Sequence, residues 1–422
     1  MGIFDYKYLN KAKIHGFDNY KYNCIDNSPI SVYISHPFWN WFVNFYPIWL
    51  APNVITLVGA SLVMGCYFLI SYMDPYITRN SFDNKNESPI PDWFWLLAAI
   101  CTFLGHLLDG TDGKQARRTG ASGPTGELFD HGLDSYATLP FTITIFSIFG
   151  QGTYSTSPQR LLGVLISVQL VFIVTHWEKY NTGVLFLSWG YDLSQYGLVF
   201  FYLFTYINGY QFYQFEPIKG YTFVQLFELG FYLSCIISFL MSFYNMYKAY
   251  FIEKSGKQKN FYEFSLPMVS PIILFTSSVM WANYSPSNVI TLSPRIFFWT
   301  VGTVFSNVAV HLIISQMSCT RTQIFNKLVT VYFIISLLSI LNIFGEYELG
   351  VLKMAAVIFT LLHLHYGICL VHQLCDHFKI NAFNLNYINK NDPKHEQKES
   401  MKVFSFPEGM KRYRLLSNCE EY

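Results

Sequence analysis

Charged residues are scarce in this sequence, and their scarcity excludes most soluble folds. Only 13% of the 422 residues are Asp, Glu, Lys or Arg, whereas a soluble domain usually carries about 25%. The formal net charge is +1, so the chain has no strong overall field to attract a nucleic acid or an acidic partner. Hydrophobic residues make up 52% of the chain. This balance is typical of a protein that resides in a lipid bilayer.

Paired cysteine motifs and a secretion signal are also missing. The 8 cysteines are scattered, and none forms a Cys-x-x-Cys pair, which argues against a zinc site or a disulfide framework. Residues 1–35 are polar and aromatic and lack the apolar stretch of a signal peptide. We therefore expect internal segments to direct membrane insertion.

Long apolar runs are what the chain does have. A spanning helix needs about 20 apolar residues, and Val54–Met73 supplies such a run without a charge. Further candidates begin near Trp93, Ser135, Leu161, Gly197, Leu229, Phe264, Ile296, Leu328 and Met354. We expect an all-α polytopic membrane protein with about ten transmembrane helices, eight or nine being the alternatives. Basic residues favour the loops after even-numbered spans and both ends of the chain, which predicts cytosolic termini.

Composition divides the chain into four stretches. Residues 1–50 are expected to form a cytosolic segment, in which the aromatic-rich run Pro37–Leu50 predicts an amphipathic helix at the membrane interface. Residues 51–228 hold the transmembrane helices that carry an unusual polar motif. Residues 229–376 hold the remaining transmembrane helices. Residues 377–422 form a polar, lysine-rich tail that is expected in the cytosol.

Four aspartates mark the junction of the second and third expected spans. Asp109 and Asp112 are three residues apart, and Asp130 and Asp134 are four apart. Such spacings place each pair on one helix face, and the short connection makes the two helices antiparallel neighbours. We therefore expect the four carboxylates to converge at the cytosolic end of a helical hairpin. Divalent cations would neutralise them, and oxygen ligands alone favour Mg²⁺, Mn²⁺ or Ca²⁺.

Small residues and an arginine accompany these acids. Gly113 and Gly126 have no side chain where helices and a phosphate would approach closely. Ala116 is small and shares a face with the first pair of aspartates. Arg117 carries a planar fork that can hold a phosphate oxygen. Together these residues indicate a site for metal ions and a diphosphate.

The run from Asp109 to Asp134 resembles the signature of the CDP-alcohol phosphotransferase family. It reads D-x-x-D-G-x-x-A-R, then eight residues, then G-x-x-x-D-x-x-x-D, and every defined position matches. Other stretches are similar to the eukaryotic choline/ethanolamine branch, so that nearly the whole chain is covered: Gly16–Asp18, Lys21–Tyr22, His36–Trp39, Ala51–Asn53, Gly113–Thr119, His176–Tyr180 and His363–Gly367. Within that branch, His176–Gly183 and Trp189–Asp192 look more like the ethanolamine-specific members than the dual-specificity ones.

The resemblance implies an enzyme that moves a phosphoalcohol from a CDP-alcohol to a lipid. The expected reaction transfers phosphoethanolamine from CDP-ethanolamine to diacylglycerol or an alkyl-acylglycerol, releasing CMP and forming phosphatidylethanolamine. Choline, or both alcohols, is the alternative. The resemblance also implies a homodimer in the membrane of the endoplasmic reticulum or the Golgi, with the active site facing the cytosol. Residues 229–376 would then supply an acceptor cavity and dimer contacts.

Site residues carry over from the family at the matching positions. Two Mg²⁺ or Mn²⁺ ions are expected on Asp109, Asp112 and Asp130, with Asp134 as a fourth ligand or as the general base. The pocket for CDP is expected to contain Asn53, Asp112, Gly113, Ala116, Arg117 and Gly126.

The base that deprotonates the acceptor hydroxyl stays open between two residues. His131 titrates nearer to cytosolic pH than an ordinary carboxylate and is preferred, whereas Asp134 is the family's usual candidate. Glu127 lies four residues before His131 and either orients its ring or faces solvent. Glu178, Asp192 and several tyrosines are available to hold the ethanolamine ammonium, and the sequence does not choose among them.

A transporter of divalent cations or solutes is the alternative from another functional class. Ten spans with intramembrane acids are compatible with it. Transporters usually place their charges near the membrane midplane, on broken helices. Here the acids lie at one helix end beside an arginine, which favours the transferase.

Overall fold

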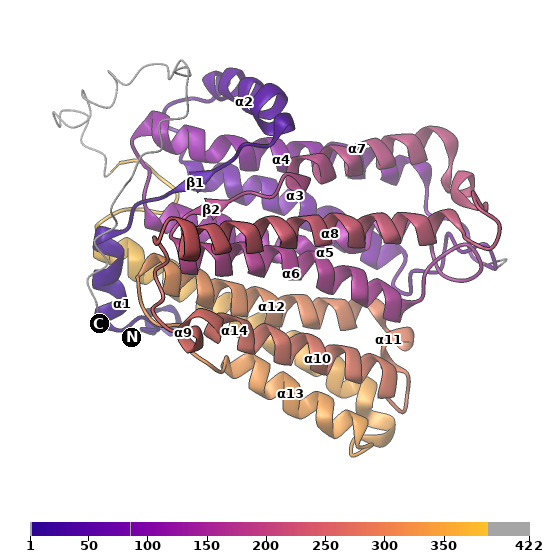
Figure 1. Cartoon of the computed structure of the whole chain (residues 1–422). Helices are drawn as coiled ribbons and strands as arrows, with labels where there is room; N and C mark the ends of the chain where they lie inside the picture. Colours follow the sequence, from indigo (N-terminus) through magenta and orange to yellow (C-terminus); the bar gives the residue numbers. More distant parts are fainter. Residues whose placement is uncertain (1, 85, 387–422) are drawn as a thin grey trace.

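Helices dominate the fold, and the long ones lie side by side in one bundle (Figure 1). The computed structural model describes residues 2–84 and 86–386. The long helices of this part of the chain are α3 (Pro52–Met73), α4 (Asp92–Thr119), α5 (Pro124–Phe146), α6 (Pro158–Thr182), α7 (Gly190–Asn208), α8 (Phe223–Tyr247), α10 (Val269–Tyr284), α12 (Pro294–Met317), α13 (Lys327–Ile340) and α14 (Glu348–Phe378). Two short helices, α9 (Phe261–Ser265) and α11 (Val289–Leu292), lie in the connections.

Seven helical segments of the described chain are long and apolar enough to cross a membrane. They are α3, α4, α6 and α12 together with Phe223–Ile252, Phe261–Tyr284 and Gly345–Phe378. A polytopic helical membrane protein is thereby confirmed, but the expected count of ten spans is not. Of the remaining long helices, α5 begins with the charged motif and α13 has only 14 residues. The acidic motif counts against α5, whereas α13 is apolar and is excluded by its length alone.

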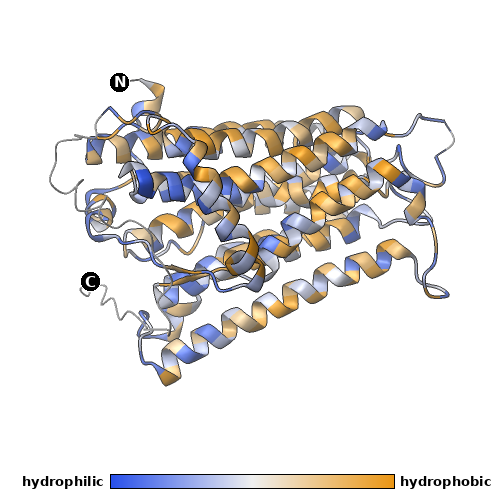
Figure 2. Ribbon diagram, turned by 90° about the horizontal axis from the view of Figure 1, so that it is seen from above, coloured by the Kyte–Doolittle hydropathy of each residue, from blue (hydrophilic) through white to orange (hydrophobic). Residues whose placement is uncertain are grey.

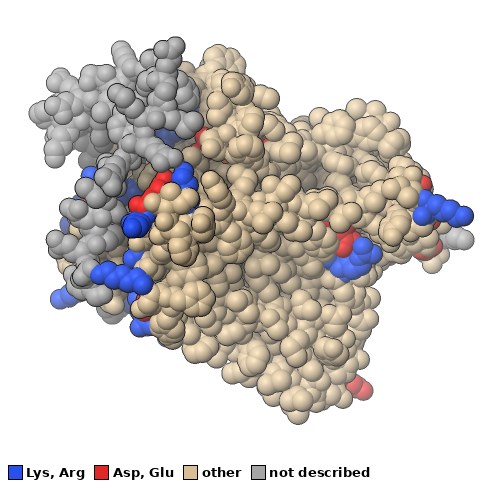
Figure 3. All heavy atoms as spheres, in the orientation of Figure 1, with Lys and Arg blue, Asp and Glu red and all other residues tan. Residues whose placement is uncertain are grey.

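The distribution of charge agrees with a membrane protein. Lys, Arg, Asp and Glu gather towards the two ends of the bundle, and an uncharged band separates them on the face that Figure 3 shows. Hydrophobic residues run along the helices, as Figure 2 shows from above. Because a bilayer core is about 30 Å thick and holds no water, such a band is what lipid contact requires.

Proline and glycine mark several helix boundaries. Pro52, Pro124 and Pro294 occupy the first position of α3, α5 and α12, where a missing N–H costs no hydrogen bond. Gly120 and Gly183 follow α4 and α6 with φ of 74° and 80°, a left-handed conformation that glycine adopts without steric cost. These residues determine which polar side chains fall at the ends of the bundle.

Helix α12 forms the centre of the bundle, and α8 lies at its edge. In their most apolar stretches, 83% of α12 residues are buried, against 22% for the helix that contains α8. The core around α12 includes large side chains such as Trp95, Trp281 and Phe305, all fully buried. The rigid centre thus lies behind α5, which packs directly on α12.

The N-terminal segment crosses the end of the bundle where α4 and α6 finish. Helix α1 (Lys11–Gly16) lies on α12, and β1 (Cys24–Ile25) pairs in parallel with β2 (Leu185–Phe186), which follows α6. Further along, His377 near the end of α14 contacts Asp18 at 2.6 Å. This segment therefore ties together helices that are far apart in the sequence.

A helical stretch runs from residue 31 to residue 45, so it begins and ends earlier than the interfacial helix expected over Pro37–Leu50. Its central part is α2 (His36–Phe42), flanked by one π-helical and one 3-10 turn. Trp39 is buried against the bundle, whereas Trp41 and Phe45 are exposed. The amphipathic character is therefore present, and the contact with lipid stays a prediction, as do the four compositional divisions. Residues 387–422, most of the expected tail, lie outside the described residues.

Candidate active site

The acidic motif forms the expected helical hairpin. Helix α4 ends at Thr119, and the Ala121 backbone N–H closes its last turn on the Ala116 carbonyl at 2.9 Å. Helix α5 begins only a few residues later, at Pro124. Helix α3 packs against both helices. The motif therefore lies where α3, α4 and α5 meet, at the end of the bundle that the N-terminal segment crosses.

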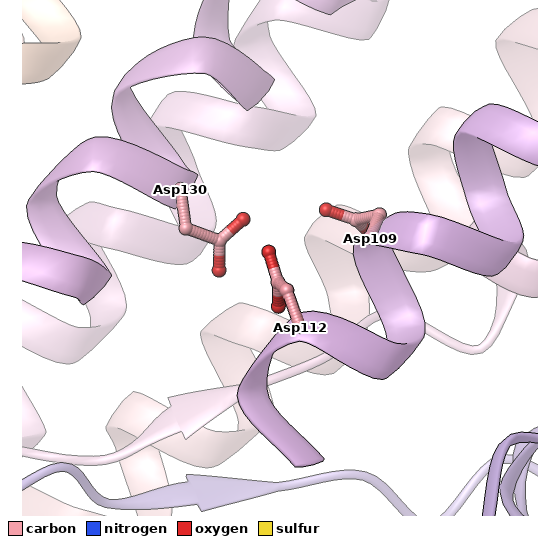
Figure 4. A group of neighbouring side chains, drawn as sticks. All are labelled: Asp109, Asp112 and Asp130. Carbon is pink, nitrogen blue, oxygen red and sulfur yellow. The ribbon is translucent and has the colours of Figure 1, made fainter. Parts of the chain in front are cut away.

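Three of the four predicted metal ligands come together across this hairpin. Asp109, Asp112 and Asp130 each offer a carboxylate oxygen, and these atoms lie within 4.8 Å of one another. Figure 4 shows the three side chains converging from the two helices. Asp134 is not part of this group, although its carboxylate approaches that of Asp109. The first three carboxylates thus converge as expected, and Asp134 lies beside Asp109 but outside the group of three.

The carboxylates of this group have few partners within the protein. Asp109 accepts a hydrogen bond from the Tyr191 hydroxyl at 2.9 Å, and Asp112 accepts one from Thr56. The Oδ1 atom of Asp130 is buried and has no partner among the residues described. None of the three forms an ion pair with a described Lys or Arg. Since crowded, poorly paired carboxylates are costly, the residues fit hard divalent cations such as Mg²⁺ or Mn²⁺.

Glycines near this motif fall into two kinds. A Cβ at Gly110 would overlap the indole ring of Trp39, so protein packing itself requires glycine there. A Cβ at Gly113 would lie 3.7 Å from Arg117, and one at Gly126 would lie 3.5 Å from Asn53, both ordinary contacts. Neighbouring protein atoms therefore do not explain Gly113 and Gly126. A ligand that approaches the backbone closely would account for both glycines.

The predicted CDP residues lie beside the same two glycines. Asn53, in the first turn of α3, lies beside Gly126 of α5, and Arg117 lies one turn after Gly113 on α4. Arg117 is exposed, and it makes no ion pair with any residue that the structure describes. Ala116 is partly exposed on the same helix. A free guanidinium beside a glycine backbone and carboxylates suits a phosphate group.

His131 and Glu127 have different surroundings from those expected. The His131 ring is buried and stands edge-on to the ring of His176, with centroids 5.3 Å apart. Glu127 accepts hydrogen bonds from Lys179 at 2.5 Å and Tyr20 at 2.6 Å. The structure, which describes residues 2–84 and 86–386, has no hydrogen bond between Glu127 and His131. The structure thus offers no hydrogen bond by which Glu127 would orient His131.

Sequence reasoning missed several residues that hold the site. Tyr191 and Thr56 contact two of the acids directly, and Tyr191 lies in the stretch Trp189–Asp192 that was already conspicuous. Asp192 accepts bonds from Ser31 and Ser35 and lies 3.1 Å from His106 Nε2. No signal in the sequence pointed to Thr56.

Comparison with known proteins gives one consistent family. Residues 49–241 match the model of the CDP-alcohol phosphatidyltransferase family. Human Ethanolaminephosphotransferase 1 is 40% identical over 395 residues, which cover 93% of this chain and 98% of that protein. The mouse protein of the same name is 41% identical over 91% of this chain and 96% of its own. Zebrafish (Danio rerio) Cholinephosphotransferase 1 is 26% identical over 90% of this chain and 96% of its own.

Proposed function

The chain belongs to the CDP-alcohol phosphatidyltransferase family, and we propose that it transfers phosphoethanolamine from CDP-ethanolamine to diacylglycerol or an alkyl-acylglycerol. The products are CMP and phosphatidylethanolamine or its alkyl-acyl counterpart. Relatives named for ethanolamine are 40–41% identical over nearly the whole chain, whereas a zebrafish relative named for choline is 26% identical over 90% of it. This difference favours ethanolamine as the head group.

The observation that carries the proposal is the group of three carboxylates beside an unpaired arginine. Asp109, Asp112 and Asp130 lie within 4.8 Å of one another, and Arg117 stands on the same helix as the first two. A diphosphate needs positive charge on several oxygens at once. The cations held by the carboxylates and the guanidinium of Arg117 would supply this positive charge from two sides.

Two Mg²⁺ or Mn²⁺ ions are part of the proposal. Asp109, Asp112 and Asp130 would hold them, with Asp134 as a fourth ligand if it does not act as the base. When bound, such ions neutralise the diphosphate and the charge that develops on the transferred group.

The chain's own residues position the donor and move the proton. Arg117 and Asn53 bind and orient the CDP part, and Gly113 and Gly126 leave room for it. The acceptor oxygen forms its bond to the phosphorus that carries ethanolamine, and the bond from that phosphorus to CMP breaks. The hydroxyl proton passes to a base, for which buried His131 is preferred over Asp134.

The finer topology is also proposed. Helices α5, α7 and α13 run beside the seven apolar segments (Figure 1), so ten helices would cross the bilayer with both termini in the cytosol. The active site would then face the cytosol, in the endoplasmic reticulum or the Golgi. A homodimer is proposed from the family alone.

One assay tests the reaction and the head group together. Purified protein in detergent receives diacylglycerol, Mg²⁺ or Mn²⁺, and either CDP-ethanolamine or CDP-choline, and CMP release is measured. A chelator and an Asp112→Ala variant serve as controls. We expect metal-dependent CMP release with CDP-ethanolamine and much less with CDP-choline. Equal turnover would overturn the head group, and no release from either by folded protein would overturn the reaction.

A further inference from the structure

We infer that Glu127 and Tyr22 form the site that holds the ammonium of the ethanolamine head group. The inference rests on the proposed function and assigns a group that the sequence left open among several acids and tyrosines. It gives Glu127 a role other than the two that the sequence left open, orienting His131 or facing solvent.

The two other acidic candidates are already occupied or closed off. Asp192 has both carboxylate oxygens engaged, Oδ2 by Ser31 and Ser35 and Oδ1 by His106. Glu178 has no exposed surface, and its Oε1 accepts a bond from Asn245 of α8. A substrate entering from the cytosolic end would find neither carboxylate available.

Glu127, in contrast, has a free carboxylate oxygen and some exposed surface, whereas the free Oε2 of Glu178 is fully buried. Lys179 and Tyr20 both donate to Oε1, and Oε2 has no hydrogen bond to any residue in the described chain. The side chain is 8% exposed, so the free oxygen is reachable rather than sealed. A primary ammonium can donate a charge-assisted hydrogen bond to such an oxygen.

Glu127 also lies at the right distance from the acids that anchor the phosphate. It is three residues before Asp130 on α5 and therefore on the same face, with Cβ atoms about 5–6 Å apart. In phosphoethanolamine, four bonds of about 1.5 Å separate phosphorus from nitrogen, which gives about 5 Å when extended. A phosphate held near Asp130 thus places its ammonium beside Glu127.

Tyr22 completes the site with an aromatic surface. Its ring lies 5.1 Å from the Lys179 Nζ atom and 6.3 Å from the His131 ring, yet 50% of the residue is exposed. Lys179 in turn pairs with Glu127. Tyr22 therefore lies beside the Lys179–Glu127 pair and still presents open surface, where a cation gains from the ring face.

Lys179 explains why a primary ammonium would be preferred. Its own ammonium already lies 5.5 Å and 5.1 Å from the rings of Tyr20 and Tyr22. A trimethylammonium has no hydrogen to donate to Glu127 and would compete with Lys179 for the same ring faces. Binding then depends on the hydrogen bond to Glu127 Oε2, which only ethanolamine can make.

The test compares Glu127→Gln with a matched control, Glu228→Gln. Gln keeps an oxygen for Lys179 and Tyr20 but replaces the free oxygen with an NH₂ donor. Glu228 is likewise buried beside a cation and a tyrosine, Arg160 and Tyr232, at the far end of the bundle, and both of its oxygens are engaged. A merely structural role for Glu127 would make the two variants behave alike.

Two constants are measured on the purified full-length protein: KM for CDP-ethanolamine and the inhibition constant of CDP, which lacks the head group. For Glu127→Gln we expect KM to rise about 10- to 100-fold with the CDP constant unchanged. Tyr22→Leu should raise KM about 3- to 10-fold in the same selective way. Glu228→Gln should change neither constant.

Other results would overturn the inference in distinguishable ways. If KM and the CDP constant rise together, or if neither changes in Glu127→Gln and Tyr22→Leu, the ammonium site lies elsewhere while the proposed function stands. If the unaltered protein releases no CMP from CDP-ethanolamine, the proposed function itself fails, and this inference fails with it.

Discussion

The acids at the two ends of the bundle are treated in opposite ways. At the end away from the site, Asp74 lies 3.8 Å from Arg295, and Glu228 is 2.7 Å from Arg160. Glu348 accepts bonds from Trp281, Ser285 and Ser287. At the site end, three carboxylates lie together and share two hydroxyl donors.

This difference separates acids that stabilise the fold from acids that bind a ligand. A buried charge is tolerated when donors or an opposite charge surround it, and it is costly otherwise. The far end meets most of that condition from within the protein, since each acid there has a cation or several donors beside it, although Asp74 Oδ2 accepts no hydrogen bond from the described residues. The site end meets it only when a cation and a phosphate are added, which is why the pairing pattern, more than the number of acids, indicates function.

The largest effect is expected for Asp112→Asn. An amide is a much poorer ligand for a divalent cation than a carboxylate, so CMP release should fall on the order of 10³-fold. Thermal stability should stay the same or rise, because the repulsion from Asp109 and Asp130 decreases. Initial rates and thermal unfolding in detergent measure the two quantities. A variant with near-normal rates would place the ligand site elsewhere.

Arg295→Met, at the other end of the bundle, should lower stability and leave activity nearly unchanged. The change leaves Asp74 buried without its cation and should lower the free energy of unfolding by about 3–5 kcal/mol. Turnover per folded molecule should stay within about twofold, since the two ends are far apart. Chemical denaturation measures the free energy of unfolding, and initial rates divided by the amount of folded protein measure the turnover. A large loss of turnover in folded protein would contradict the division between the two ends.

The two kinds of glycine on α4 give opposite predictions. Gly110→Ala pushes a methyl group into the Trp39 ring and should destabilise the protein by about 1–3 kcal/mol. Gly113→Ala makes only an ordinary contact with Arg117 and should keep or slightly raise stability. It should, however, raise KM for CDP-ethanolamine about tenfold, because the methyl group displaces the ligand. Equal behaviour of the two variants would show that Gly113 serves packing as well.

The smallest effect is expected from Tyr191→Phe. Losing the hydroxyl that contacts Asp109 should raise the Mg²⁺ or Mn²⁺ concentration for half-maximal activity about tenfold. Tyr196→Phe is the matched control, because its hydroxyl contacts Ser35 and no site acid. This metal concentration is measured by titrating both variants with Mg²⁺ or Mn²⁺. An equal increase in both would assign the effect to the packing of α7.

Much of the candidate site was predictable because it is local in sequence. The spacing of Asp109, Asp112 and Asp130 placed them on two helix faces, and the short turn brought those faces together. Arg117 and Gly113 followed from the same periodicity. Hydropathy likewise predicted a polytopic helical protein, although it overcounted the helices that meet the criterion for crossing a membrane.

The remainder depended on contacts between distant parts of the chain. Glu127 was expected either to orient His131 or to face solvent, yet its partners are Lys179 and Tyr20, 52 and 107 positions away. The sequence around Gly110 likewise did not predict its contact with Trp39, which lies on α2. No periodicity encodes such partners.

The sequence by itself determined the membrane class, the hairpin of acids and the family. These depend on how residues repeat along a helix, and the geometry of a single helix is the same wherever it packs. Only the tertiary structure decided which acids are neutralised from within and which stay open. That outcome depends on which helices and strands become neighbours, because burial makes an unpaired charge costly and the available partners lie on other elements.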